Sequence, residues 1–186
     1  MKRILDLGLA LIASLILFFP FVILYIACRL TDEGPVLYWS QRVGANSRLF
    51  LMPKIRTMKL NTPQVATHLL TNGQDYLTPL GSFLRKTSLD EIPQLYSILK
   101  GDMSFVGPRP ALFNQQDLMA LRKEAGVDHL IPGLTGWAQI NGRDEISLEE
   151  KVRFEKEYLL NRGLIFDLKI LFWTFFKVLR QESVRH

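Results

Sequence analysis

The sequence has few side chains that bind metals or form cross-links. Its 186 residues include one cysteine, Cys28, and three histidines. A single cysteine cannot form an intramolecular disulfide, which favours a cytoplasmic globular part. No cysteines or histidines are paired at the spacing of zinc ligands, so a structural zinc site is not expected. The sequence also lacks internal repeats and low-complexity tracts.

Charge is missing from a long segment near the N-terminus. No charged residue occurs from Leu7 to Cys28, and about 20 apolar residues suffice to span a bilayer. The run is too long for a signal peptide and ends in bulky residues. A spanning helix is one interpretation, although basic residues at both ends give no direction of crossing. Pro20 favours the other, a re-entrant helix, because proline inside a helix removes a hydrogen bond and bends the chain.

The charge balance agrees with a protein that works at a membrane. The net charge is +5, with a pI near 9.4. Basic residues gather after the apolar run, at Arg42, Arg48, Lys54, Arg56 and Lys59. A basic face beside a membrane attracts anionic headgroups and phosphorylated substrates. The alternative for each residue is a solvated surface position.

The sequence predicts an α+β fold that is mainly helical. Strand-forming residues 36–41 and 49–55, joined by a turn-forming segment, indicate a small β-hairpin. Helical patterns predict helices at residues 80–85, 88–100, 113–124, 147–160 and 166–182. Ser147 and Glu150 have the spacing of a capping box. In the last helix, apolar residues recur at helical spacing beside cations, which favours an amphipathic helix in the membrane interface over one that faces the core.

An acidic pair, Asp90-Glu91, lies at the predicted start of the helix at residues 88–100. Ser88 and Glu91 have capping-box spacing, so capping is one explanation for Glu91. Asp90 is a candidate catalytic residue, because free N–H groups at a helix start would keep its carboxylate ionised and oriented. Such a carboxylate is a competent nucleophile towards phosphorus. The stiff loop Gly107-Pro108-Arg109-Pro110 follows and would aim an arginine at phosphate.

Several motifs occur in order along nearly the whole chain. They are Gly34-Pro35-Val36, Gln41-Arg42-Val43-Gly44, Lys54-Ile55-Arg56-Thr57-Met58, Thr78-Pro79-Leu80-Gly81, Leu84-Arg85-Lys86-Thr87-Ser88-Leu89-Asp90-Glu91, Gly101-Asp102-Met103-Ser104-Phe105-Val106-Gly107-Pro108-Arg109-Pro110, Pro132-Gly133-Leu134-Thr135-Gly136-Trp137, Asn141-Gly142-Arg143 and Asp167-Leu168-Lys169. Together they resemble the bacterial sugar transferase family, and within it the small monotopic phosphoglycosyl transferases. Two positions depart from the family pattern. Phe19-Pro20 stands where Ser-Pro is common, and Ile55 where an aromatic residue is usual.

The resemblance implies a reaction. The family transfers a phosphosugar from a UDP-sugar to polyprenyl (undecaprenyl) phosphate and releases UMP, the first membrane step of glycoconjugate biosynthesis. By this resemblance Asp90 attacks the β-phosphorus and forms a covalent aspartyl-phosphosugar intermediate. Glu91, with Asp90, would hold Mg2+, because magnesium sites combine one or two carboxylates with substrate phosphates.

The resemblance also implies roles for residues away from the acidic pair. Five cations are candidates for binding the substrate phosphates: Arg85, Arg109, Lys54, Arg56 and Arg143. Asp167 is a third candidate catalytic acid, which would orient one of these cations or assist the reaction. The alternatives for Asp167 are capping the last helix and neutralising Lys169.

These expectations divide the chain into a re-entrant membrane helix, residues 1–30, and a cytoplasmic membrane-associated catalytic domain, residues 31–186. The expected location is the cytoplasmic face of the bacterial inner membrane. The expected partners are the UDP-sugar, polyprenyl phosphate and membrane lipids, and the exposed anchor leaves room for a homodimer. A membrane-anchored scaffold that binds acidic lipids without catalysis is the alternative, but it does not explain Asp90-Glu91. No nucleic-acid-binding module is recognised, so nucleic acid is not an expected partner.

Overall fold

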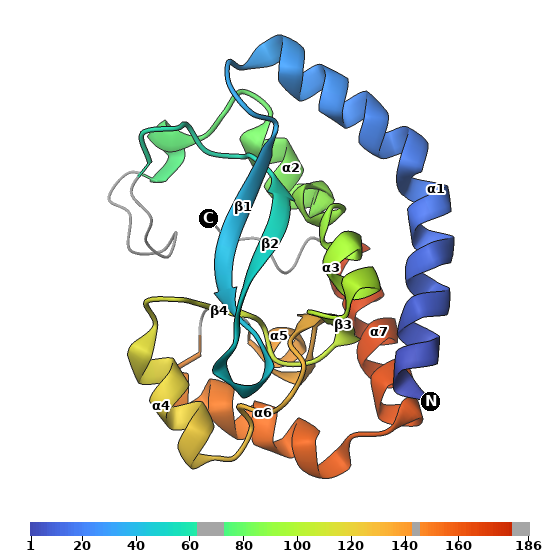
Figure 1. Cartoon of the computed structure of the whole chain (residues 1–186), viewed down its shortest axis with the longest axis vertical. Helices are drawn as coiled ribbons and strands as arrows, with labels where there is room; N and C mark the ends of the chain where they lie inside the picture. Colours follow the sequence, from blue (N-terminus) through green and yellow to red (C-terminus); the bar gives the residue numbers. More distant parts are fainter. Residues whose placement is uncertain (63–72, 143–145, 180–186) are drawn as a thin grey trace.

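A computed structural model describes residues 1–62, 73–142 and 146–179 (Figure 1). The mainly helical α+β class is confirmed. In chain order the elements are α1 (Lys2–Thr31), β1 (Leu37–Val43), η1 (Ala45–Ser47), β2 (Leu49–Ile55), η3 (Gly73–Tyr76), α2 (Gly81–Thr87), η4 (Leu89–Glu91), α3 (Gln94–Lys100), β3 (Ser104–Val106), β4 (Ala111–Leu112), α4 (Gln116–Glu124), β5 (Gly133–Thr135), α5 (Trp137–Asn141), α6 (Leu148–Asn161) and α7 (Leu164–Leu179).

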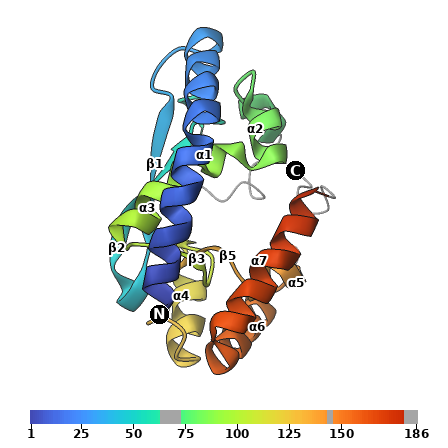
Figure 2. The same cartoon turned by 90° about the vertical axis from the view of Figure 1, so that its right-hand side faces the viewer.

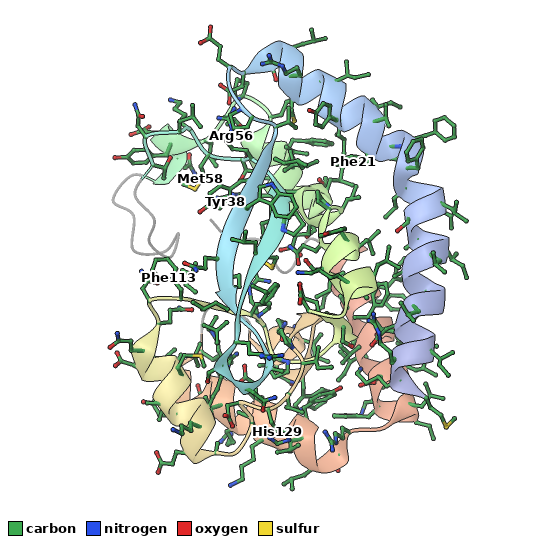
Figure 3. All side chains as sticks on the ribbon, in the orientation of Figure 1. Phe21, Tyr38, Arg56, Met58, Phe113 and His129 are labelled. Atoms are coloured by element: carbon green, nitrogen blue, oxygen red, sulfur yellow. The ribbon has the colours of Figure 1, made fainter. Side chains whose placement is uncertain are left out.

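Helix α1 is long, bent and mostly uncovered. It stays continuous through Pro20, and Figure 3 shows Phe21 beside the bend. The bend agrees with the predicted effect of the proline. The helix is long and apolar enough to cross a membrane. Its outer face, including Leu15 at 77% and Phe19 at 73% exposure, packs against no other part of the described chain. An apolar face of this size indicates membrane association.

The opposite face of α1 packs onto the globular part along both halves of the helix. In the first half, Ala10 joins a buried cluster with Met52 and Ile98, from β2 and α3. In the second half, Cys28 joins a cluster with Ile55 and Leu84, from β2 and α2. Figure 2 shows α1 in front of α3, with the sheet on one side and α7 on the other. The membrane helix is therefore built into the fold at both ends.

The predicted hairpin is confirmed as β1 and β2. These strands are antiparallel, with Tyr38 opposite Lys54 and Arg42 opposite Phe50. Strand β4 pairs with the other edge of β1, where Arg42 faces Leu112. Because side chains alternate along a strand, Tyr38, Arg42 and Lys54 share one face of the sheet. This shared face brings three polar side chains of the hairpin together.

A second, smaller sheet joins two of the sequence motifs. Strands β3 and β5 are parallel, with Ser104 opposite Gly133 and Val106 opposite Thr135. The close approach requires glycine, because a Cβ on Gly133 would lie 2.1 Å from the backbone nitrogen of Gly107. The motifs around Gly107 and Gly133 therefore form one structural unit. Val106 contributes to the largest core cluster, which also includes residues of α4, α6 and α7.

The helix boundaries differ from the predicted ones in informative places. The helix predicted to start at residue 113 begins at Gln116. Just before it, the Gln115 side chain accepts a hydrogen bond from the Leu112 amide. Ser147 caps α6 as predicted, and its hydroxyl accepts from the Glu150 amide at 3.2 Å. Helix α7 begins at Leu164, and residues 180–182 of the predicted helix lie outside the described residues.

Helix α7 exposes most of its apolar face. The exposed residues of its apolar stripe are Leu168, Phe172, Trp173, Phe175 and Phe176. Ile170, by contrast, is fully buried in the core. A helix that only faced the core would cover the aromatic residues, so this pattern favours the predicted interfacial position.

Candidate active site

The acidic pair lies on a tight turn rather than at a helix start. Helix α2 ends at Thr87, and Ser88 adopts a left-handed conformation with φ 56° and ψ 18°. Its hydroxyl makes no capping hydrogen bond to the 3₁₀ turn that carries Asp90 and Glu91. The predicted capping box of Ser88 and Glu91 is therefore wrong. An N-cap residue is typically extended, whereas Ser88 closes α2 in the left-handed region, and α3 begins only at Gln94.

This turn carries both carboxylates to the same lysine. Lys54, from β2, lies 3.0 Å from Glu91 Oε1 and 3.7 Å from Asp90 Oδ2. The Asp90 side chain is 9% exposed and that of Glu91 is 15% exposed. Paired charges with this little exposure to water interact strongly, because the surrounding dielectric is low. Lys54 therefore joins the acidic turn to the β-hairpin.

Burial is the main influence on the charge of Asp90. It raises the pKa of this carboxyl group above its usual range, with Glu91 acting in the same direction. Lys54, Arg85 and Arg109 oppose this effect. The sequence predicted that backbone amides at a helix start would keep Asp90 ionised. The turn that carries Asp90 is too short to act as a helix start. Three neighbouring cations favour the ionised form instead.

All three of these cations belong to the predicted phosphate-binding set. The Arg109 guanidinium lies 3.7 Å from Glu91 Oε1. Arg85 lies at the end of α2, and its Nε donates to Thr57 Oγ1 at 2.9 Å. Burial lowers the pKa of Arg85, and the nearby Asp90 carboxylate opposes that change. The structure thus brings Arg85, Arg109 and Lys54 to the acidic pair.

Arg42 is a further cation of this site that the sequence did not assign. Burial first, and then the charge of Arg109, lower its pKa to about 10, so its side chain stays cationic at neutral pH. It donates to Ser40 Oγ at 2.9 Å and to the Pro110 carbonyl at 3.2 Å. Strand alternation was the signal that could have found it, because Arg42 and Lys54 share the same face of the hairpin.

Arg56 is not brought to the acidic pair. Arg56 forms an ion pair with Asp32 at 2.8 Å, and it donates to the carbonyls of Glu33 and Pro35. Figure 3 shows it at the upper end of the hairpin, next to the connection from α1. Its contacts stabilise the turn between α1 and β1. Arg143 lies outside the described residues.

Asp167 lies in a different polar cluster. It is 3% exposed, and its carboxylate accepts from Lys2 Nζ at 2.6 Å and from the Tyr158 hydroxyl at 2.8 Å. Lys169 instead lies over the ring of Trp137. Neither predicted alternative, helix capping or neutralisation of Lys169, describes these contacts. Asp167 joins the first turn of α1 to α6 and α7.

The fold and the site define a class of protein. A bent apolar helix carries a globular part in which two partly buried carboxylates face four cations, an arrangement suited to phosphate chemistry at a membrane. The chain belongs to the bacterial sugar transferase family, whose model matches residues 1–181.

Three relatives show the range of the family. The chain is 38% identical to the undecaprenyl-phosphate galactose phosphotransferase of Salmonella typhimurium, over 98% of this chain and 41% of that protein. It is 36% identical to the UDP-glucose:undecaprenyl-phosphate glucose-1-phosphate transferase of Escherichia coli, over 95% of this chain and 40% of that protein. It is 38% identical to the uncharacterized sugar transferase EpsL of Bacillus subtilis, over 100% of this chain and 90% of that protein. The chain thus spans less than half of the two relatives named for a reaction.

Proposed function

We propose that this protein transfers a phosphosugar from a UDP-sugar to undecaprenyl phosphate, giving undecaprenyl-diphosphate-sugar and UMP. The observation that carries the proposal is the acidic pair surrounded by cations from three parts of the chain: Arg42, Lys54, Arg85 and Arg109. Four cations exceed two carboxylates, and a nucleotide diphosphate would balance the excess positive charge. The names of the Salmonella and Escherichia coli relatives support the choice of lipid carrier and donor.

The proposed chemistry has two displacement steps at one phosphorus atom. In the first, an Asp90 carboxylate oxygen attacks the β-phosphorus of the UDP-sugar, the bond to the bridging oxygen breaks, and UMP leaves with that oxygen. In the second, a phosphate oxygen of the lipid attacks the same phosphorus and releases the Asp90 carboxylate. Arg85 and Arg109 would bind the diphosphate oxygens through their guanidinium forks. Splitting the transfer in this way is the general advantage of covalent catalysis.

Mg2+ fits this site together with the substrate. Among the residues that the structure describes, no group of three or more acidic, histidine or cysteine side chains could hold a metal ion alone. Mg2+, however, is commonly bound by one or two carboxylates plus substrate phosphates. Glu91 and Asp90 would supply the carboxylates, and Glu91 would exchange its contact with Lys54 for the ion. The bound ion neutralises charge on the diphosphate.

The contacts of α1 support a re-entrant helix. A straight helix of 30 residues is about 45 Å long, which exceeds the roughly 30 Å hydrocarbon core. A spanning helix would therefore place its ends on opposite sides of the bilayer. Here Lys2 binds Asp167 near one end, and Cys28 packs with Ile55 and Leu84 near the other. Both ends thus contact the same globular part, which would meet UDP-sugars in the cytoplasm and the lipid phosphate at headgroup depth.

A half-reaction tests the proposed chemistry. The purified protein is incubated with a panel of UDP-sugars and Mg2+ but without polyprenyl phosphate. We expect UMP in an amount equal to the protein and a phosphosugar mass on the Asp90 peptide. Asp90→Asn should form neither product, whereas Asp117→Asn, at an exposed acid on α4, should form both. Full transferase activity in Asp90→Asn would rule out the covalent mechanism.

Two further measurements test the metal ion and the topology. Glu91→Gln should weaken the Mg2+ dependence of UMP release, and an unchanged dependence would remove Glu91 from the metal site. Accessibility labelling of both termini in intact cells should place them in the cytoplasm. A periplasmic N-terminus would contradict the re-entrant helix.

A further inference from the structure

The loop that carries Arg109 is held through its backbone carbonyls. Pro108 and Pro110 have no N–H group, so the carbonyl oxygens carry most of the loop's hydrogen-bonding capacity. The Pro108 carbonyl accepts from the Gly133 amide at 2.8 Å. The Arg109 carbonyl accepts from Arg122 at 2.9 Å, and the Pro110 carbonyl accepts from Arg42 at 3.2 Å. Donors from β5, α4 and β1 therefore fix three consecutive peptide units.

The donor to Arg109 is itself held by a buried carboxylate. Arg122, on α4, is 5% exposed and Glu155, on α6, is 2% exposed. Arg122 Nε donates to Glu155 Oε2 at 2.8 Å, and a second guanidinium nitrogen donates to Oε1 at 2.5 Å. This two-pronged contact fixes the plane of the guanidinium group. The same nitrogen that meets Oε1 also reaches the Arg109 carbonyl.

Stability alone does not account for a buried ion pair at this position. The cost of removing two charges from water commonly cancels their attraction, and apolar residues of similar volume often stabilise a core as well or better. An apolar pair, however, cannot donate a hydrogen bond to the Arg109 carbonyl. The contact with Arg109 is therefore the property that distinguishes this pair from ordinary core packing.

We propose that Arg122, oriented by Glu155, is a positioning residue that sets the direction in which Arg109 meets the substrate phosphates. The inference rests on the proposed function, because it requires Arg109 to bind the diphosphate. Arg122 itself does not touch the reacting atoms. It acts through the backbone of Arg109, whose side chain extends to Glu91 at 3.7 Å. A displacement of about 1 Å at such a group costs about 10²-fold in rate.

A double-mutant cycle tests this role. The variant Arg122→Met with Glu155→Leu removes both charges and keeps apolar volume, so neither partner is left buried and unpaired. We expect kcat/KM for UMP release to fall by about 10- to 100-fold while the melting temperature changes little. In an Arg109→Ala background the same two substitutions should change kcat/KM by less than about 2-fold, because sites that act through one group are not additive.

Binding of inorganic pyrophosphate provides a second readout that does not need turnover. Its affinity should weaken in the Arg122 and Glu155 variant, and should show the same non-additivity with Arg109→Ala. The matched control is Arg153→Met with Glu150→Gln, which removes an exposed ion pair of α6 and should leave both readouts unchanged. Arg122→Lys, which keeps the charge but not the fork, should recover only part of the activity.

The outcomes separate the inference from the proposed function. Equal losses from the Arg122 and Glu155 substitutions in the wild-type and Arg109→Ala backgrounds would overturn the positioning role and leave the reaction standing. Full activity and unchanged pyrophosphate binding in Arg109→Ala would overturn both the positioning role and the assignment of Arg109 to the substrate. A loss of activity that follows the loss of folded protein would assign the pair to stability alone.

Discussion

Replacing Lys54 by methionine should destabilise the protein in a way that depends on pH. The Lys54 ammonium lies 3.7 Å from Asp90 and 3.0 Å from Glu91, and its side chain is 17% exposed. With an effective dielectric constant of about 20, the two attractions amount to about 4.5 and about 5.5 kcal/mol. The lost desolvation of the lysine and the remaining arginines offset much of this. Removing one partner of a buried pair costs about 3–5 kcal/mol, and we expect the lower end.

That loss corresponds to a fall in melting temperature of about 6–12 °C for a chain of this size. Without Lys54 the ionised carboxylates have lost their nearest cation, so the pKa of Asp90 rises further in the folded state. The penalty is present above that pKa, where the carboxylate is ionised, and is relieved as the pH falls through it. The gap in melting temperature between Lys54→Met and wild type should therefore be largest at pH 8 and narrow towards pH 5.

The measurement is thermal unfolding in detergent at the two pH values, followed by intrinsic fluorescence. Lys54→Arg, which keeps a cation, should recover most of the loss. Lys123→Met, at an exposed position on α4, controls for the removal of a lysine. An equal loss at pH 5 and pH 8, or no loss at either, would refute the electrostatic reasoning for this site.

Asp90→Asn should raise the melting temperature while abolishing UMP release, because burial raises the pKa of Asp90 and its ionised form is less stable in the fold than in water. For the same reason, wild-type UMP release should fall at a higher pH on acidification than an ordinary aspartate would predict. Asp167→Leu should cost about 1–3 kcal/mol of stability and change kcat/KM by less than about 3-fold, because its carboxylate contacts a lysine and a tyrosine outside the acidic pair. Gly133→Ala should unfold the β3–β5 unit, because its Cβ would meet the Gly107 backbone, whereas Gly8→Ala on α1 meets no atom within 4 Å and should be neutral.

Each of these predictions has a contradicting result. A lower melting temperature in Asp90→Asn would mean that the ionised carboxylate stabilises the fold. Native stability in Asp167→Leu, together with a loss of about 100-fold in kcat/KM, would return Asp167 to a catalytic role. A Gly133→Ala variant as stable and as active as Gly8→Ala would contradict the close approach of β3 and β5.

The sequence predicted the elements more accurately than their ends. The hairpin was identified from its strand-forming residues, and the Ser147 cap from the spacing of a capping box. Ser88 and Glu91 have the same spacing, yet Ser88 adopts a left-handed conformation and makes no cap. The difference lies in the backbone of the two serines: Ser147 is extended, as an N-cap requires, whereas Ser88 closes the preceding helix α2. Local spacing is sufficient for prediction only where no neighbour restricts the backbone.

The candidate site was predicted in part, because its members come from distant parts of the sequence. Arg85, Asp90 and Glu91 are close in sequence and stay together. Arg42 was missed, because only strand alternation and the pairing of β1 with β4 bring it to the Arg109 loop. Arg56 was included through the resemblance, but it follows the last residue of β2 and pairs there with Asp32, away from the acidic pair.

The sequence by itself determined the apolar helix, the bend at its proline, the family and the acidic pair, because each depends on residue types and their order along the chain. Only the tertiary structure decided which charges meet. In the fold, Lys54 contacts both Asp90 and Glu91. Asp167 pairs with Lys2 at the start of α1, and Arg122 donates to the Arg109 carbonyl. Charge interactions fall off with distance and depend on burial, and both are properties of the folded chain rather than of its order.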